Sequence, residues 1–228
     1  MTSVPPVIAI DGPSGSGKGS VATAVAARLD FHFLDSGALY RVLGIAALRA
    51  GTDLEDAEAV RELAASMDIE FGRDGAEAVW LNGEDISRDI RTHIGSAMAS
   101  RVGATPAARK ALYARQLAFR RPPGLVADGR DMGTVVFPDA ALKIFLTASA
   151  EERAQRRYKQ LIGKGIGAIL PDLLRDLKER DARDSERPVS PLKPAEDAIV
   201  LETTELTLEE VIERVMALVR ERLPGKGS

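Results

Sequence analysis

Short apolar runs alternate along the chain with longer segments in which apolar residues recur at helical spacing. The short runs are rich in Val, Ile and Leu, which is typical of buried strands. The longer segments are typical of helices that pack one face on a sheet. Strands that alternate with helices predict an α/β fold with a parallel sheet, flanking helices and right-handed crossovers. The predicted strands of this sheet begin near Val7, Phe31, Leu125, Leu142 and Ala198.

Capping patterns mark the predicted starts of several helices. Thr52, Ser149 and Thr207 are each followed three residues later by Glu, which is the capping-box pattern. Thr105 precedes Pro106, a capping residue followed by proline at the first helical position. The predicted helices span about residues 18–29, 38–50, 52–66, 106–121, 149–161, 171–187 and 207–222.

The segment from about residue 67 to residue 90 interrupts this rhythm. Residues 69–71 and 79–81 are short runs rich in apolar and aromatic residues, separated by the glycine-containing region Gly72–Gly75 and followed by Asn82-Gly83. Such runs around glycine turns are typical of antiparallel strands. We therefore predict an insertion that contains a small antiparallel sheet.

Composition narrows the class of protein. The 228 residues suit one domain with insertions, and a net charge of −3 argues against a general nucleic-acid-binding protein. The sequence has no cysteine, which excludes disulfides and thiolate nucleophiles. No apolar run is long enough to span a membrane, and residues 1–6 lack a signal-peptide pattern. We expect a soluble, cytoplasmic protein without a membrane partner.

A phosphate-binding pattern follows the first strand. Gly12, Gly17 and Lys18 fit G-x-x-x-x-G-K, with a strand before and a helix after the pattern. Glycines allow backbone N–H groups to surround a phosphate, the helix points its positive end at that anion, and Lys18 adds a charge. The pattern predicts a site for a nucleoside triphosphate. The residues expected to line it are Gly12, Pro13, Ser14, Gly15, Ser16, Gly17, Lys18, Gly19 and Ser20.

The loop departs from the usual pattern at Gly19, which separates the lysine from the hydroxyl of Ser20. This G-K-G-S form resembles the loop of nucleoside monophosphate kinases more than that of GTPases or transport ATPases. Ser20 is kept as a candidate magnesium ligand, although its hydroxyl comes one residue later than usual.

Two further clusters lie near predicted strand ends, where open α/β sheets bind ligands. Asp128 is placed to hold Mg²⁺ through water, Arg130 to reach a phosphate and Asp131 to accept a hydrogen bond from an amino group. A turn with local ion pairs is the alternative interpretation. The second cluster offers the hydroxyl of Ser36, the phenol of Tyr40 and the cation of Arg41. An ordinary helix start with an exposed arginine is the alternative interpretation of this cluster.

Charged residues also recur at helical spacing on two segments around the glycine-rich joint Gly163–Gly167. Each set falls on one helix face, and a solvated charged face is the ordinary explanation. Arginines beside a glycine joint would also suit a lid that clamps an anion. The sets are Arg153, Arg156 and Arg157, and Arg180, Asp184 and Arg187.

Five blocks in this order resemble the bacterial cytidylate kinases: GPSGSGKG, LDSGALYR, ADGRDMGTVVFPDA, EERAQRR and KERDARDSER-x-VSPL. The resemblance covers essentially the whole chain. It implies a P-loop nucleotide kinase fold with a monophosphate-binding insertion and a helical lid. It also implies one kinase domain, with its core at about 1–36, 104–150 and 170–228, the monophosphate-binding region at about 37–103 and the lid at about 151–169.

The resemblance implies roles for individual residues. Catalysis is expected of Lys18, Asp128, Arg130, Arg153 and Arg157, with Arg156 also at the ATP site and Mg²⁺ held by Ser20 and Asp128. Ser100, Arg109 and Asp131 match positions that read cytosine. The full set expected to bind CMP is Ser36, Tyr40, Arg41, Ser100, Arg109, Arg130, Asp131, Arg180, Asp184 and Arg187.

These features predict Mg²⁺-dependent transfer of phosphate from ATP to CMP and dCMP by a monomeric enzyme. One alternative is a kinase for another monophosphate such as UMP. The other is a non-catalytic nucleotide-dependent switch. A GTPase would need N-K-x-D, but the only asparagine is Asn82, and a transport ATPase would need L-S-G-G-Q, which is absent.

Overall fold

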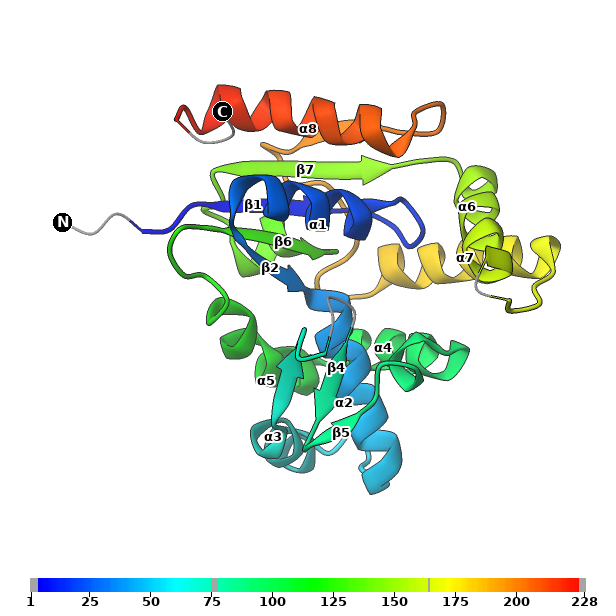
Figure 1. Cartoon of the computed structure of the whole chain (residues 1–228). Coiled ribbons are helices and arrows are strands. Elements are labelled where there is room, and N and C mark those ends of the chain that lie inside the picture. Colours follow the sequence, from blue (N-terminus) through cyan, green and yellow to red (C-terminus); the bar gives the residue numbers. More distant parts are fainter. Residues whose placement is uncertain (1–3, 75–77, 164, 226–228) are drawn as a thin grey trace. The chain divides into compact units, whose positions relative to one another are not determined.

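The computed structural model describes residues 4–74, 78–163 and 165–225. The chain divides into two compact units, Met1–Asp35 with Leu117–Ser228, and Ser36–Gln116 (Figure 1). Gly75 of the first glycine region and Lys164 of the glycine joint lie outside the described residues. The predicted division into core, monophosphate-binding region and lid concerns function and stays a prediction.

The first unit is built on a five-stranded sheet in the order β2-β6-β1-β7-β8, and every strand pair is parallel, as predicted. Asp11 at the end of β1 pairs in register with Gly129, and Asp35 at the end of β2 pairs with Asp128. The carboxyl ends of three strands therefore meet at one edge. The strands are β1 (Val7–Asp11), β2 (His32–Asp35), β6 (Leu125–Gly129), β7 (Leu142–Thr147) and β8 (Ile199–Glu202).

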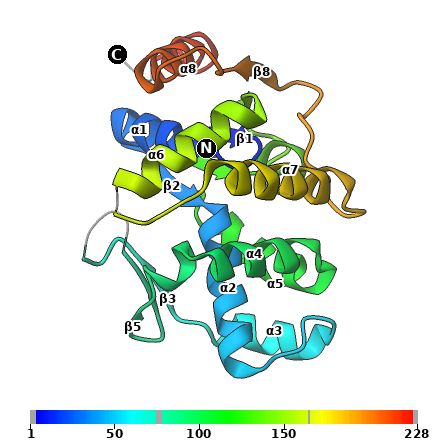
Figure 2. The same ribbon diagram turned by 90° about the vertical axis from the view of Figure 1, so that its right-hand side faces the viewer.

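Helices and one helical turn complete the first unit. Helices α1 and α8 pack against each other, and their apolar faces share one buried cluster with β1, β6 and β7 (Figure 1). Helices α6 and α7 pack side by side (Figure 2). The elements are α1 (Lys18–Leu29), the π-helical turn η2 (Met132–Val136), α6 (Ala150–Gly163), α7 (Leu170–Glu186) and α8 (Leu208–Arg222).

The second unit combines helices with the predicted antiparallel sheet, whose strand order is β3-β4-β5. Helices α2 and α4 are in close contact, because a Cβ at Gly44 would lie 2.7 Å from the Cβ of Met98. The elements are α2 (Ser36–Ala50), α3 (Ala57–Ser66), β3 (Ile69–Phe71), β4 (Val79–Leu81), β5 (Glu84–Asp85), the 3₁₀ turn η1 (Asp89–Arg91), α4 (His93–Ala104) and α5 (Pro106–Leu117).

Most predicted helices begin close to their predicted starts, but helix α4 was not predicted and one predicted cap is wrong. Thr207 and Glu210 form the predicted capping box of α8, and the Ser149 hydroxyl accepts from the Glu152 N–H at the start of α6. The capping box predicted at Thr52 is wrong. Helix α3 begins only at Ala57, because the Asp56 carboxylate accepts from the backbone N–H groups at the start of that helix.

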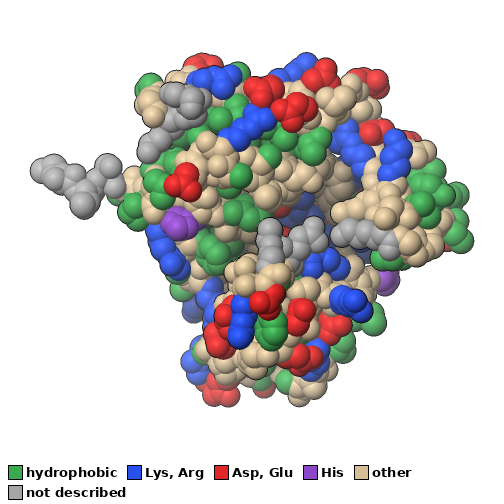
Figure 3. Space-filling model, viewed as in Figure 1, with side chains coloured by type: hydrophobic (Ala, Val, Ile, Leu, Met, Phe, Trp, Pro, Cys, Tyr) green, Lys and Arg blue, Asp and Glu red, His purple; other side chains and the backbone are tan. Residues whose placement is uncertain are grey.

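The surface of the first unit carries exposed apolar side chains where α6 and α7 are joined (Figure 3). Ile162, Ile166 and Ile169 are each about half or more exposed. Among the residues that the structure describes, no helix is both long and apolar enough to cross a membrane.

Candidate active site

The loop between β1 and α1 needs glycine at three positions. Gly15 and Gly17 have φ angles of 79° and 88°, in the left-handed region that glycine adopts readily. Gly12 has no room for a side chain, because a Cβ there would lie 2.1 Å from the Leu146 carbonyl oxygen. The sequence pattern that predicted a phosphate loop therefore reflects real backbone constraints.

Cationic side chains hold three carbonyl groups of this loop. Lys18 Nζ donates to the Pro13 oxygen at 3.1 Å. Arg153 donates to the Ser14 oxygen at 3.0 Å, and Arg156 donates to the Ser16 oxygen at 3.3 Å. In a trans peptide the C=O of one residue and the N–H of the next point in opposite directions. The N–H groups that follow Ser14 and Ser16 therefore point away from the two arginines.

The hydroxyl of Ser16 also suits an anion-binding loop. Its residue is only 2% exposed. Within the described part of the chain, this buried oxygen has no hydrogen-bond partner. Buried polar atoms are normally paired, so an unpaired hydroxyl in this glycine-rich loop fits a phosphate oxygen.

Lys18 is buried beside this loop at 8% exposure. Burial and the positive charge of Arg130 lower the pKa of the Lys18 amine to about 7. The negative charge of Asp128 acts in the opposite direction but does not cancel this shift. Nζ of Lys18 lies 4.0 Å from Oδ1 of Asp128. A bound triphosphate would favour the protonated amine, because an opposite charge stabilises the charged form.

Gly19, the departure from the usual loop pattern, allows the close approach of Asp128. A Cβ at this position would lie 3.2 Å from Asp128 Oδ2. Ser20, the candidate magnesium ligand, is exposed on the first turn of α1.

The carboxylate of Asp128 suits a magnesium site of few protein ligands. Mg²⁺ is usually bound by one or two carboxylates together with substrate phosphates and water. Within residues 4–74, 78–163 and 165–225, no group of three or more acidic, histidine or cysteine residues could hold a metal by itself. The single carboxylate of Asp128 fits Mg²⁺ that arrives with a nucleotide.

A cluster of cations surrounds Asp184 on α7. Arg130 Nε donates to Asp184 Oδ2 at 3.1 Å, and Arg180 Nε lies 3.9 Å from the same oxygen. Burial raises the pKa of the Asp184 carboxyl, but the charges of Arg130, Arg180 and Arg187 outweigh burial, and the net shift is downward. Arg187 donates to the Ser190 carbonyl oxygen. The structure thus brings four predicted acceptor residues into one electrostatic cluster.

The three arginines predicted for a lid differ in their surroundings. Arg153 is 4% exposed and contacts the Ala148 carbonyl and both carboxylate oxygens of Asp181, besides the loop. Arg156 contacts Thr203 and the loop. Arg157 donates to Gln160 on its own helix at 2.7 Å. Two of these arginines therefore brace the loop backbone, and their contact with donor phosphates stays a prediction.

In the second unit the predicted residues lie on three helices, and two contacts between α2 and α5 involve them. The Ser36 hydroxyl donates to Gln116 at 2.9 Å, and both side chains are buried. The Arg109 guanidinium lies 5.8 Å from the centre of the Tyr40 ring. Arg41 and Ser100 are partly buried.

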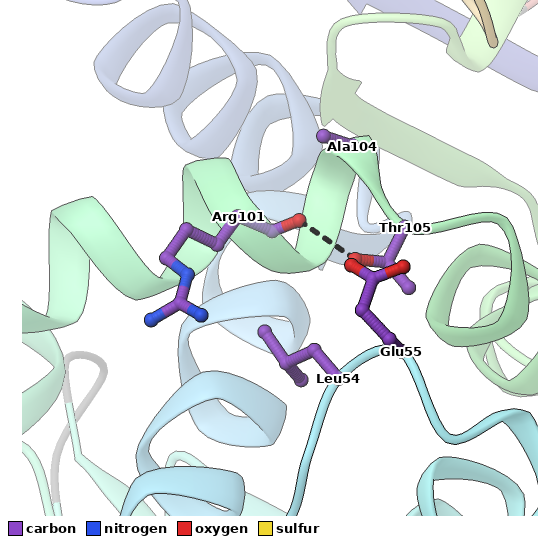
Figure 4. A pocket seen from close by; sticks show the side chains of 5 residues that line it. All are labelled: Leu54, Glu55, Arg101, Ala104 and Thr105. Carbon is purple, nitrogen blue, oxygen red and sulfur yellow. Dashed lines mark hydrogen bonds between the residues drawn. The ribbon is translucent and has the colours of Figure 1, made fainter.

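A pocket of about 210 Å³ in this unit contains none of the predicted residues (Figure 4). The Thr105 hydroxyl at its wall donates to the Arg101 carbonyl at 3.0 Å. The lining residues are Leu54, Glu55, Arg101, Ala104 and Thr105.

One acidic residue next to the site, Asp11, was missed from the sequence. Its carboxylate accepts from the backbone N–H groups of Met132 and Gly133. Burial raises the pKa of the Asp11 carboxyl to about 7, although the two backbone hydrogen bonds lower it. The sequence did contain a signal for Asp11, because this acid ends an apolar strand. Burying a charged group costs free energy, so an acid at such a position is expected to have a specific partner.

Comparison with known proteins agrees with this geometry. Residues 8–221 match the family model described as cytidylate kinase. The chain belongs to the cytidylate kinase family. Cytidylate kinase of Stutzerimonas stutzeri is 58% identical over 95% of this chain and 96% of its own length. Cytidylate kinase of Chromobacterium violaceum is 57% identical over the same shares of the two chains.

A third cytidylate kinase, from Pectobacterium atrosepticum, is 54% identical over 98% of this chain and all of its own length. The family match therefore includes both compact units. The family match, the parallel sheet and the small antiparallel sheet together confirm the P-loop kinase fold that the sequence blocks indicated.

Proposed function

We propose that this chain transfers the γ-phosphoryl group of ATP to CMP and dCMP. The family match over residues 8–221 carries this proposal, because it covers both units together with the phosphate loop. Relatives with more than half of their residues identical are named cytidylate kinase.

The donor site is the loop from Gly12 to Lys18. Its left-handed glycines, the unpaired buried hydroxyl of Ser16 and the buried amine of Lys18 all suit phosphate oxygens. When bound, Mg²⁺ neutralises charge on the donor phosphates. We propose that Asp128 holds the ion through water, with Ser20 as a further candidate ligand.

The acceptor needs no general base. Its phosphate has a second pKa of about 6 and is mostly ionised near neutral pH. One of its oxygens forms a bond to the γ-phosphorus of ATP. The bond from that phosphorus to the bridging oxygen breaks, and its electron pair leaves with ADP as CDP forms. Lys18 and the arginines act by positioning and by stabilising charge.

Selectivity for cytosine rests on Asp131, which is 2% exposed. A carboxylate accepts a hydrogen bond from the N4 amino group of cytosine, whereas O4 of uracil presents another acceptor. A buried polar group left unpaired makes such discrimination large. The roles of the second-unit residues Ser36, Tyr40, Arg41, Ser100 and Arg109 stay predictions, as do the monomeric state and the cytoplasmic location.

Formation of ADP from Mg-ATP with separate acceptors tests this function. We expect turnover with CMP and dCMP, little with UMP, AMP or GMP, and almost none without an acceptor. The Lys18→Met variant should lose about a hundredfold or more in kcat, since a buried cation at developing charge is removed. ATP binding without turnover on any monophosphate would instead support a nucleotide-dependent switch, and equal rates with CMP and UMP would contradict cytosine selectivity.

A further inference from the structure

The carboxylate of Asp11 lies at the carboxyl end of β1, directly before the phosphate loop. Its residue is 5% exposed. Oδ1 accepts from the Met132 N–H at 2.9 Å, and Oδ2 accepts from the Gly133 N–H at 2.8 Å. Both oxygens are thus directed at the first two residues of the π-helical turn η2. The first N–H groups of a helical turn lack partners within that turn, so a carboxylate stabilises them.

Asp131 is the residue immediately before this turn. Its carbonyl oxygen accepts from the N–H groups of Val135 and Val136, at 2.9 and 3.2 Å. The peptide groups that follow it are held by Asp11. The backbone at Asp131 is therefore fixed on its carboxyl side by a hydrogen-bonded turn and by a carboxylate from a neighbouring strand.

The turn is also closely packed at Gly133. A Cβ at Gly133 would lie 3.1 and 3.2 Å from Cδ and Cγ of Lys143 and 3.5 Å from Asp11 Oδ2. The amine of Lys143 is in turn tied to Asp197 at 2.9 Å. Little space is left for the turn to shift without disturbing Asp11 or Lys143.

We propose that Asp11 is a positioning residue for base selection: it fixes the turn that places the Asp131 carboxylate against the acceptor base. This inference rests on the proposed function, in which Asp131 reads cytosine. Asp11 touches neither substrate in this scheme. Because its two hydrogen bonds are made to backbone N–H groups, the role requires two acceptor oxygens at this site.

The Asp11→Asn variant replaces one acceptor oxygen with an amide NH₂ group that faces a backbone donor. We expect the ratio of kcat/KM for CMP to that for UMP to fall about tenfold, which is the discrimination carried by a good base contact. The KM for ATP should change by less than about twofold. The control is Val215→Ala on α8, a buried truncation remote from the turn, which should lower stability and leave the ratio unchanged.

A double-mutant cycle separates this inference from the proposed function. Asp131→Asn alone tests whether Asp131 reads the base. A ratio of kcat/KM for CMP to that for UMP near one in the unaltered protein would contradict the proposed selectivity itself. If Asp131 reads the base and Asp11 positions it, Asp11→Asn should add almost nothing to the loss of selectivity in the Asp131→Asn background, because coupled residues are not additive. Equal losses with CMP and UMP, or additive losses, would overturn the positioning role.

Asp11→Glu provides a second test at the same position. It keeps two acceptor oxygens but moves them along a longer side chain, so the hydrogen bonds to the turn are disturbed and the CMP to UMP ratio should again fall. Urea unfolding shows whether each variant is folded. A folded Asp11→Glu variant with wild-type selectivity would overturn the inference even if Asp11→Asn fails to fold.

Discussion

Burial controls the chemistry of Lys18. The side chain donates to the Pro13 carbonyl inside the loop and lies among Asp128, Arg130 and Arg180. Its pKa of about 7 means that much of the amine is neutral in the nucleotide-free protein above neutral pH. A triphosphate supplies the negative charge that the protonated amine needs.

Binding of Mg-ATP should therefore take up a proton at Lys18. The bound state has the higher pKa, so uptake is small below pH 7 and approaches one proton in the range between the free and bound pKa values. The apparent affinity should fall by up to about tenfold for each pH unit above 7. Calorimetry at pH 8 in buffers of different ionisation enthalpy measures the uptake directly.

The matched control for this measurement is Lys18→Met, which removes the titrating amine. Its binding heat should be the same in every buffer. The account of Lys18 would be wrong if the unaltered protein also showed no dependence on the buffer.

At the scale of elements, α6 and α7 are joined by two ion pairs of different kinds. Arg153 and Asp181 form a largely buried pair, in which the arginine also donates to the Ser14 carbonyl of the phosphate loop. Glu151 and Lys178 form a pair at 2.9 Å whose side chains are more than half exposed. The contact between α6 and α7 thus contains one buried ion pair and one exposed ion pair, which can be compared directly.

We expect Asp181→Asn to lower the free energy of unfolding by about 2–3 kcal/mol, because it leaves a buried guanidinium partly unpaired. Lys178→Gln, the surface control, should cost less than about 1 kcal/mol. Asp181→Asn should also raise the KM for ATP, since the donor to Ser14 is less firmly held. Urea unfolding and initial rates check both, and equal effects of the two variants would contradict the bracing role of Arg153.

Elements with strong local signals were predictable from the sequence. The buried strands were visible as apolar runs, and α8 was visible through Thr207 and Glu210. The start of α3 was not, because Thr52 and Asp56 both offer plausible caps and only the folded backbone selects Asp56. The turn η2 was also missed, because the carboxylate that holds it comes from Asp11 on a distant strand.

The candidate site was predictable to a similar extent. Glycine spacing located the phosphate loop, because Gly15 and Gly17 adopt left-handed φ angles and Gly12 lies too close to the Leu146 carbonyl to carry a side chain. Helical spacing placed Arg153, Arg156 and Arg157 near one another, and it also places Glu152 one turn before Arg156, with which it forms an ion pair at 2.9 Å. Spacing along one helix does not show which residues outside that helix are contacted, such as Asp181 by Arg153 and Thr203 by Arg156.

At the scale of the whole molecule, the predicted site residues are divided between the two units. The donor loop and the Arg130, Arg180 and Asp184 cluster belong to the first unit, whereas Ser36, Tyr40, Arg41, Ser100 and Arg109 belong to the second. Cations gather around the loop although the chain carries a net charge of −3. The local positive charge therefore reflects placement by the fold rather than composition, and it suits two anionic nucleotides.

The central claim is selective phosphoryl transfer to cytidine monophosphate, and a competition measures it most directly. The protein is incubated with limiting Mg-ATP and equal concentrations of CMP and UMP, and the nucleotides are separated by anion-exchange chromatography. The account predicts ADP equal to the sum of CDP and UDP, with CDP at least about tenfold in excess. Equal amounts of CDP and UDP, or ADP without either diphosphate, would contradict it.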